Sequence, residues 1–226
     1  MKKLLFIITI AYIVSSCIQK ETKIDISILN GIWLNKNYLD HILKYKDPRS
    51  AQNIADISFI KFPHLNTNNA LIVYSFHEGN GVNVKLEKNN ILLGDDTIKI
   101  IDNNLTYNNT EFIKTSIIDE AMILEELIFS GSYIYNNTEI KLLPNGEIEG
   151  SDELIAYSVN IDYMDAGMNQ NKMSIRNNER IENYGFIFNN DTLNIYDLMC
   201  VTYDSTNKIC VEIKNGNQKY QLIKKD

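Results

Sequence analysis

The stretch Ile140-Lys141-Leu142-Leu143-Pro144-Asn145-Gly146-Glu147-Ile148-Glu149 places two short apolar runs on either side of an Asn-Gly pair. Asn-Gly favours a tight hairpin loop, because both residues tolerate the positive φ angles that such loops need. Similar polar triplets follow at Asn189-Asn190-Asp191 and Asn215-Gly216-Asn217. These stretches predict antiparallel strands joined by hairpin turns.

Short apolar stretches bounded by Asn, Asp or Gly recur along most of the chain, a pattern typical of closely spaced strands. We predict strands at residues 57–62, 70–76, 82–86, 97–101, 133–135, 139–143, 155–161, 172–175, 184–188, 192–196, 199–203, 209–213 and 219–223. Apolar residues follow helical spacing in two segments, 38–43, which stops before Asp47-Pro48, and 117–128. The chain is therefore predicted to be all-β and mainly antiparallel, with one or two short helices.

The second of these helices divides the chain into residues 28–115 and 130–226. Each part opens with a glycine two residues before an aromatic residue, in Gly31-Ile32-Trp33 and Gly131-Ser132-Tyr133. The repeat fits a weak internal duplication, and it equally fits the common composition of strand starts. Residues 28–226 are therefore expected to form one β domain or two halves joined by the helix; two small β-domains or a β-sandwich stay open as alternatives.

The opening Leu29-Asn30-Gly31-Ile32-Trp33, followed by a short helix and a succession of antiparallel strands, resembles the start of lipocalin-like (calycin) barrels. The resemblance implies a β-barrel whose floor is closed by Gly31 and Trp33. It also implies an arginine packed on the tryptophan ring, for which Arg176 and Arg180 are the candidates. We interpret Trp33 as a buried ring with a hydrogen-bonded indole N–H, in preference to a ligand contact.

The first residues combine Lys2 and Lys3, an apolar run over 4–14 and the sequence Val14-Ser15-Ser16-Cys17. The apolar run is shorter than the roughly 20 residues that a membrane-spanning helix needs. The pattern resembles the lipobox of bacterial lipoprotein signals. That resemblance implies a signal peptide over residues 1–16, cleavage before Cys17, and two or three acyl chains such as palmitate on that cysteine, which together anchor a protein stably.

Residues 17–27 are then the lipidated N-terminus and tether, ahead of the β domain. Ile18 follows the cysteine in place of Asp, which in enterobacteria-like sorting implies the outer membrane of the bacterial cell envelope. The alternatives are an ordinary cleaved signal, with Cys17 as an incidental thiol, and an uncleaved short anchor. Each alternative still places the β domain outside the cytoplasm.

Charge and composition argue against nucleic acid as a partner. The formal net charge is −7, and no cluster of Lys and Arg interrupts the acidic balance. With 44% hydrophobic residues, the chain has enough apolar material for a packed core.

Cys200 and Cys210 flank an alternating stretch around the polar turn Asp204-Ser205-Thr206. A three-residue loop would place the two cysteines opposite one another on paired strands, which in an oxidising envelope favours a disulfide. The alternative is two buried free thiols that behave as small apolar residues.

Candidate catalytic and metal-binding residues are few. His41, His64 and His77 lack the spacing of a metal site, and the Asp162-x-x-Asp165 pair lacks the spaced acidic pattern of a calcium loop. The adjacent carboxylates Glu125 and Glu126 point in different directions on a helix and make a poor acid/base pair. We therefore predict neither an enzyme nor a metal or cofactor site, and we assign no ligand-binding residue.

The functional expectation combines the anchor with the barrel. It is a non-enzymatic, membrane-anchored envelope lipoprotein that binds a small apolar ligand in the barrel cavity. The alternative is a protein-interaction module: an inhibitor, an immunity factor or an accessory subunit of an envelope complex. The hairpins at 157–163 and 191–196 also resemble envelope lipoproteins of Bacteroidetes-like bacteria, a resemblance that implies no activity.

Overall fold

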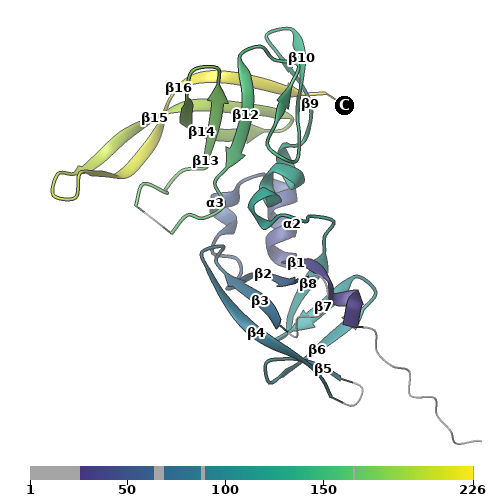
Figure 1. Cartoon of the computed structure of the whole chain (residues 1–226). Coiled ribbons are helices and arrows are strands. Elements are labelled where there is room, and N and C mark those ends of the chain that lie inside the picture. Colours follow the sequence, from purple (N-terminus) through teal and green to yellow (C-terminus); the bar gives the residue numbers. More distant parts are fainter. Residues whose placement is uncertain (1–25, 64–68, 88–89, 165, 226) are drawn as a thin grey trace, which may run out of the picture.

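The computed structural model of this chain describes residues 26–63, 69–87, 90–164 and 166–225. These residues form two eight-stranded antiparallel sheets and a few short helices (Figure 1). The fold is therefore all-β and mainly antiparallel, and this prediction from the sequence is confirmed.

The first sheet is a closed barrel. Its strands are β1 (Gly31–Asn35), β2 (Ile57–Phe62), β3 (Asn69–Tyr74), β4 (Glu78–Glu87), β5 (Asn90–Leu93), β6 (Asp96–Ile101), β7 (Asn104–Tyr107) and β8 (Thr110–Lys114). Each strand pairs with the next, and β1 also pairs with β8. Trp33 consequently lies between Ile60 of β2 and Lys114 of β8. This closed eight-stranded meander is consistent with a lipocalin-like barrel.

The second sheet repeats this topology with one weak seam. Its strands are β9 (Gly131–Tyr135), β10 (Thr138–Leu142), β11 (Ile148–Glu149), β12 (Leu154–Val159), β13 (Lys172–Asn177), β14 (Ile181–Asn189), β15 (Thr192–Asp204) and β16 (Ile209–Lys224). The first strand again pairs with the last, β9 with β16. The ends of the sheet, β11 and β12, meet at one bridge between Glu147 and Ala156, beside a 2.7 Å bond from Tyr157 N to Gly146 O. We call this barrel-like sheet the second barrel.

Two helices are inserted between β1 and β2. The Asn35 side chain caps α2 (Lys36–Tyr45) by accepting from two backbone N–H groups of its first turn, and Lys46 ends the helix in the left-handed conformation. Asp47 then caps the short helix α3 (Pro48–Ala51). The predicted helix at 38–43 is confirmed and extends two residues further at each end.

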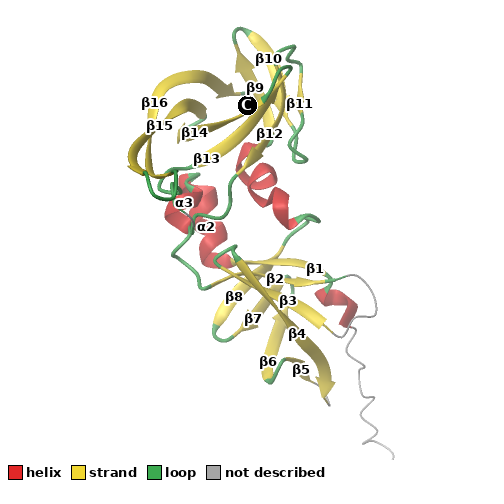
Figure 2. Ribbon diagram, turned by 60° about the vertical axis from the view of Figure 1, so that its left-hand side comes forward, coloured by secondary structure: helices red, strands yellow, loops and turns green. Residues whose placement is uncertain are grey.

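These helices bring the two barrels together. Tyr38 and Ile42 of α2 and Ala51 of α3 are buried in the hydrophobic core of the second barrel. Figure 2 shows the helices lying between the two sheets. An insertion in the first half of the chain therefore packs against the second half, which joins the barrels through apolar contacts.

The segment between the barrels is only partly helical. A 3-10 turn, η2 (Glu120–Met122), and a π-helical turn, η3 (Glu125–Phe129), replace the continuous helix predicted over 117–128. Ile117 and Ile123 pack in one cluster with Ile32 on the outer side of the first barrel. The apolar side chains of this segment therefore cover the outer wall of the first barrel.

The hairpin loops follow the sequence at some positions and depart from it at others. Gly146 (φ +81°) and Asn190 (φ +54°) form the turns predicted there. The turn predicted at 215–217 is wrong, because β16 runs without a break through these residues. Tyr196 pairs with Gln218 and Leu198 with Asn215, so Gly216 lies in a bulge of one long strand.

Candidate functional site

Trp33 lies at the floor of the first barrel and is completely buried. Its Nε1 donates to Leu29 O at 2.6 Å, which ties the ring to the preceding 3-10 turn η1 (Ile26–Leu29). The ammonium of Lys114 lies 5.5 Å from the ring centre and donates to Ile28 O at 2.7 Å. At this distance the ring attracts the cation through its negative face.

Neither arginine proposed for this place occupies it. Arg176 belongs to β13 and Arg180 precedes β14, both in the second barrel, whereas Trp33 belongs to the first. The cation over Trp33 is Lys114, whose backbone pairs with Trp33 across the closure of the barrel. The sequence-based candidates are therefore wrong, because the pairing depends on which strand closes the barrel.

The second barrel repeats the same floor. Tyr133 is also fully buried, and its hydroxyl donates to Phe129 O at 2.7 Å, again four residues back. Lys224 lies 5.8 Å from the Tyr133 ring centre and donates to Ser130 O at 3.2 Å. Gly131 (φ +144°) corresponds to Gly31 (φ +114°) in its left-handed backbone. The glycine, the aromatic ring and the lysine of the last strand therefore recur together in both barrels.

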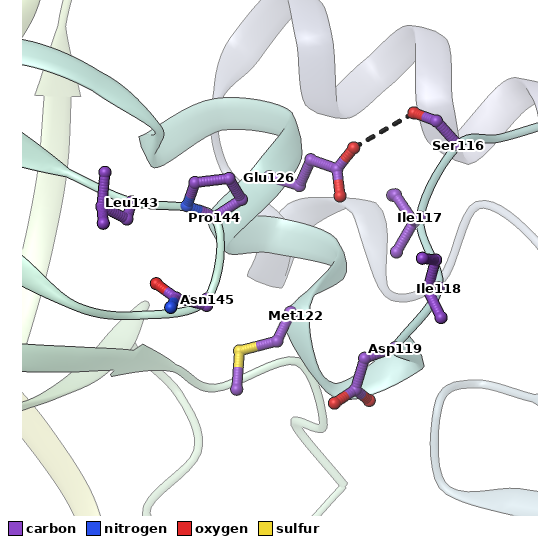
Figure 3. Close-up of a pocket in the computed structure, with 9 residues that line it drawn as sticks. All are labelled: Ser116, Ile117, Ile118, Asp119, Met122, Glu126, Leu143, Pro144 and Asn145. Carbon is purple, nitrogen blue, oxygen red and sulfur yellow. Dashed lines mark hydrogen bonds between the residues drawn. The ribbon is translucent and has the colours of Figure 1, made fainter.

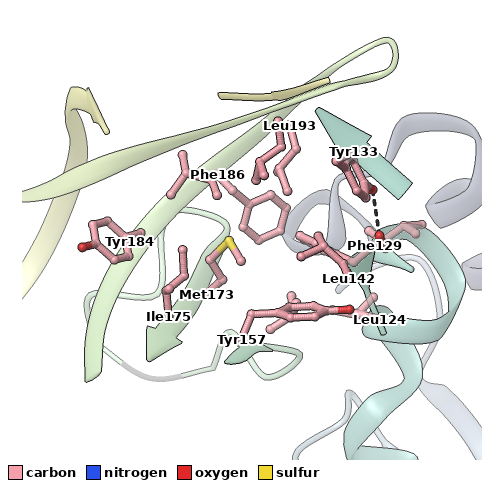
Figure 4. Close-up of a cluster of buried hydrophobic side chains, with 14 of the residues drawn as sticks. Leu124, Phe129, Tyr133, Leu142, Tyr157, Met173, Ile175, Tyr184, Phe186 and Leu193 are labelled. Atoms are coloured by element: carbon pink, nitrogen blue, oxygen red, sulfur yellow. Dashed lines mark hydrogen bonds between the residues drawn. The ribbon is translucent and has the colours of Figure 1, made fainter. Parts of the chain in front are cut away.

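Buried apolar side chains pack in the interior of both barrels. Figure 4 shows this for the second barrel, where Phe129, Phe186 and Leu193 meet at its centre and are at most 1% exposed. In the first barrel, the following side chains are completely buried: Trp33, Ile60, Leu93, Leu105 and Phe112. A side chain that lined a water-sized cavity would retain accessible surface on that side. These positions therefore have no such space beside them.

An open groove lies between the segment that connects the barrels and the turn after β10 of the second barrel. It has a volume of about 600 Å³ and is lined by Ser116, Ile117, Ile118, Asp119, Met122, Glu126, Leu143, Pro144 and Asn145. Figure 3 shows Ile117 and Ile118 on one side of the groove and Leu143 and Pro144 on the other. Ser116 Oγ donates to a Glu126 oxygen at 3.1 Å at one end. The groove therefore combines apolar walls with a few polar groups.

A buried carboxylate lies next to this groove, on the π-helical turn. Glu125 is 0% exposed, and its Oε1 accepts from Val159 N at 2.6 Å. Its Oε2 is buried and has no hydrogen-bond partner among the described residues. Burial raises the pKa of Glu125 to about 7, although the Val159 N–H opposes the rise. Below that pH the side chain is therefore a neutral carboxylic acid.

The long hairpin of β15 and β16 extends beyond the second barrel. The adjacent strand β14 pairs with β15 only as far as Asp197, so residues 198–212 form a two-stranded projection, which we call the arm. Figure 1 shows the arm reaching away from both barrels. Five of its large apolar side chains are 41–60% exposed: Met199, Val201, Tyr203, Ile209 and Val211. The arm therefore presents apolar surface to solvent.

A disulfide joins Cys200 and Cys210 across the arm, with their Cα atoms 5.8 Å apart. The register differs from the one expected for a three-residue loop. Cys200 pairs with Ile213 and Tyr203 pairs with Cys210, because Asp204 pairs with Ile209 and the turn therefore holds four residues, 205–208. Each strand also carries one bulge between these pairs, and the two bulges cancel in the register. The cysteines are therefore diagonal neighbours and not directly opposite residues.

The base of the arm is held by a loop that precedes β13. Asn169 receives a bond from Ile213 N at 2.9 Å and donates to Ile213 O at 2.7 Å. Gly167 N donates to Val211 O at 2.8 Å. This loop covers one edge of the arm, whereas residues 198–204 of β15 pair, among the described strands, with β16 alone.

The other residues considered from the sequence do not meet at one place. His41 Nε2 lies 2.7 Å from Ser50 Oγ, and His77 Nδ1 lies 2.6 Å from an oxygen of Asp162. His64, Asp165 and the proposed lipidation site Cys17 lie outside the described residues. Among the residues that the structure describes, no group of three or more His, Cys, Asp or Glu side chains is arranged to hold a metal ion.

Comparison with known proteins gives no further assignment. No family model, no curated protein and no solved structure matches the chain. Within the described parts of the chain, we find no helix with the length and apolar character needed to cross a bilayer.

Sequence reasoning missed Lys114, Lys224 and Asn169. The lysines have a recognisable signal, since each follows its Gly-x-aromatic motif in the last strand of the same barrel. Asn169 has none, because its role depends on the position of the loop against β16.

Proposed function

We propose that this chain is a non-enzymatic, lipid-anchored protein of the bacterial envelope that binds another envelope protein through its arm. The observation that carries the proposal is the set of half-exposed apolar side chains on a projecting hairpin. Large apolar side chains that cluster on a surface mark interaction sites, since each gains about 1.5–3 kcal/mol when fully buried.

The construction of the arm supports a binding role. The Cys200–Cys210 disulfide cross-links the two strands, and Asn169 holds their base. An arm restrained in this way loses less conformational entropy when it binds than a free loop of equal length. The arm is therefore preorganised for binding.

The free edge of β15 offers a specific mode of contact. Residues 198–204 carry one charged side chain, Asp204, and no proline. Exposed strand edges that avoid unwanted pairing usually carry lysine, proline, a β-bulge or a covering loop. Of these features, residues 198–204 carry only the bulge between Cys200 and Thr202. An extended segment of a partner protein can add to this edge through backbone hydrogen bonds, while Met199, Val201 and Tyr203 contact its side chains.

The anchor is the second part of the proposal and rests on the lipobox-like sequence that ends at Cys17. Two or three acyl chains on this cysteine would hold the protein stably at a membrane, by our proposal the outer membrane. A partner in the same envelope is then confined to the same thin compartment. That confinement raises the effective concentration of the partner at the arm.

Site-specific photocrosslinking in the producing bacterium tests the role of the arm. A photoreactive phenylalanine analogue replaces Tyr203 of the arm in one variant, and Ile118 in a matched control, because Ile118 is also highly exposed but lies outside the arm. We expect a crosslinked protein of one defined mass from position 203 only. We also expect an added excess of the soluble domain to reduce the yield of this crosslinked product. The same excess of a soluble variant with Met199→Ser, Val201→Ser and Tyr203→Ser should leave the yield unchanged. Absence of a product at 203, or the same product from 118, would overturn the proposal.

A small apolar ligand is a second candidate, favoured by the groove of about 600 Å³ with its Ile117, Ile118 and Met122 side chains. This candidate places the ligand in the groove, whereas the expectation from the sequence places it in the barrel cavity. Native mass spectrometry of the purified domain tests it. A bound lipid-like mass that is lost on Ile118→Asp supports the candidate, because Ile118 lines the groove and is 83% exposed. An unliganded protein from its own envelope contradicts it.

A further inference from the structure

The end of the first barrel that carries the start of the described chain has three exposed isoleucines. Ile26 and Ile28 of η1 are each 45% exposed, and Ile101 at the end of β6 is 71% exposed. We call these three side chains the anchor-end isoleucines. When these side chains face water, their exposed apolar surface has an unfavourable free energy of hydration.

These isoleucines belong to segments that meet at one residue. Lys114 donates through its Nζ to Ile28 O at 2.7 Å and through its backbone N to Asn103 O at 3.1 Å. Asn103 lies in the turn between β6 and β7, two residues after Ile101. Lys114 thus ties η1 and this turn to the same end of the barrel, so that the exposed isoleucines share one surface.

This surface is also the one closest to the proposed lipid anchor along the chain. Ile26 lies nine positions after Cys17 in the sequence. A chain of this length spans at most about 30 Å when fully extended. If Cys17 carries the acyl chains, Ile26 cannot lie farther than this from the membrane surface.

We infer that the anchor-end isoleucines rest on the phospholipid bilayer, in the interfacial region between headgroups and acyl chains. The inference rests on the proposed lipidation of Cys17 and adds the orientation of the protein on the membrane. A tethered surface meets the bilayer at high effective concentration, so even three aliphatic side chains gain from entering the interface. The short tether and the aliphatic contacts thus both hold this end of the first barrel at the bilayer.

The orientation has a consequence for the arm. Figures 1 and 2 show η1 beside the first barrel and β15 and β16 in the second barrel, on the other side of the helices. With the anchor end on the membrane, the second barrel and its arm point away from the bilayer. The arm is then accessible to a partner that approaches from the aqueous side.

Depth-dependent fluorescence quenching of the full lipidated chain tests the inference. The protein is reconstituted in vesicles of phosphatidylethanolamine and phosphatidylglycerol, and a cysteine at position 101 (Ile101→Cys) carries a polarity-sensitive fluorophore. Ile181→Cys is the matched control, because Ile181 is 68% exposed but belongs to β14 of the second barrel. Nitroxide groups on the upper acyl chains of the lipid act as quenchers.

We expect quenching at position 101 at least about twofold greater than at position 181, because an interfacial side chain lies about 5–10 Å into the headgroup boundary. Ile26→Ser combined with Ile28→Ser should reduce the difference. Equal quenching at both positions in protein that floats with the vesicles would overturn the inference and leave the anchor intact. Protein that neither floats nor carries acyl mass on Cys17 would instead overturn the anchor, and the inference with it.

Discussion

Lys114 stands over Trp33 at the closure of the first barrel, with its ammonium 5.5 Å from the ring centre. Lys224 stands over Tyr133 in the same way at the closure of the second barrel, at 5.8 Å. In both barrels the ring is tied by a hydrogen bond to the carbonyl four residues before it, and the lysine donates to a carbonyl of the same turn. Two barrels built on one plan are the simplest account of this repeat.

Removing the cation from the floor of the first barrel should weaken that barrel. In Lys114→Met the aliphatic stem remains, while the ring contact and the bond to Ile28 O are lost. We expect the free energy of unfolding to fall by about 1–2 kcal/mol. Urea unfolding followed by Trp33 fluorescence measures this, with Lys85→Met as the control, because Lys85 is exposed on β4 of the same barrel. Equal losses in both variants would contradict a special role for Lys114.

The buried carboxylate should make stability depend on pH. Burial raises the pKa of Glu125 from 4.5 to about 7 in the folded protein. The native state therefore holds a proton that the unfolded state has released, so the contribution to stability is complete below about pH 4.5 and is lost as the pH rises through 7. We expect Glu125→Gln to be more stable than the wild type at pH 8, by up to about 3 kcal/mol, and the difference to disappear toward pH 5.

Urea unfolding at pH 5, 6, 7 and 8 measures this difference. Glu126→Gln is the control, since the neighbouring Glu126 is only partly buried and accepts a hydrogen bond from Ser116. A stability difference between wild type and Glu125→Gln that stays constant across this range would refute the assignment.

The disulfide should order the arm and leave the barrels largely unaffected. The bond closes a loop with a sequence separation of 10 residues. Removing it by Cys200→Ser and Cys210→Ser should lower the free energy of local opening of the arm by about 2–3 kcal/mol, the loop-closure term for a loop of this length. We expect faster amide hydrogen exchange over 199–211 and unchanged protection at Leu193 and Leu222 in the barrel core. Loss of protection in the core would show instead that the arm and barrel unfold together.

Gly146 should be essential for the seam between β11 and β12. Its φ is +81°, and a Cβ atom there would lie 2.5 Å from Tyr157 O. Gly146→Ala should destabilise the protein by about 2 kcal/mol or more, through the left-handed backbone and the forced displacement of β12. Gly81→Ala is the matched control, because a Cβ at Gly81 meets no atom within 4 Å. Thermal unfolding should give a lower midpoint temperature for Gly146→Ala than for Gly81→Ala. Equal midpoint temperatures would contradict the proposed role of Gly146.

Several elements could be predicted from the sequence because their signals are local. A short apolar stretch predicted β2 (Ile57–Phe62), and the helical spacing of apolar residues ahead of Asp47-Pro48 predicted the centre of α2 (Lys36–Tyr45). Two further turns were missed. Asn108-Asn109 and Asn136-Asn137 connect neighbouring strands with every φ between +47° and +63°. Asparagine tolerates this conformation, so the two pairs were readable as hairpin loops.

Other features depended on distant pairing and could not be predicted. Asn215-Gly216-Asn217 has the composition of a turn, yet Gly216 does not adopt a left-handed φ. A Cβ atom there would lie 2.9 Å from the Met199 side chain on the facing strand. The glycine is therefore required by a close approach between strands and not by a reversal of the chain.

The sequence by itself determined the class of fold, since periodicity and turn chemistry act between near neighbours in the chain. It also supplied the two Gly-x-aromatic motifs and the pair of cysteines. Only the tertiary structure decided that Lys114 and Lys224 complete the barrel floors, that Glu125 is buried, and that β15 and β16 extend into an arm. These features depend on which strands pair at long range, and strand register is set by the packing of the whole barrel.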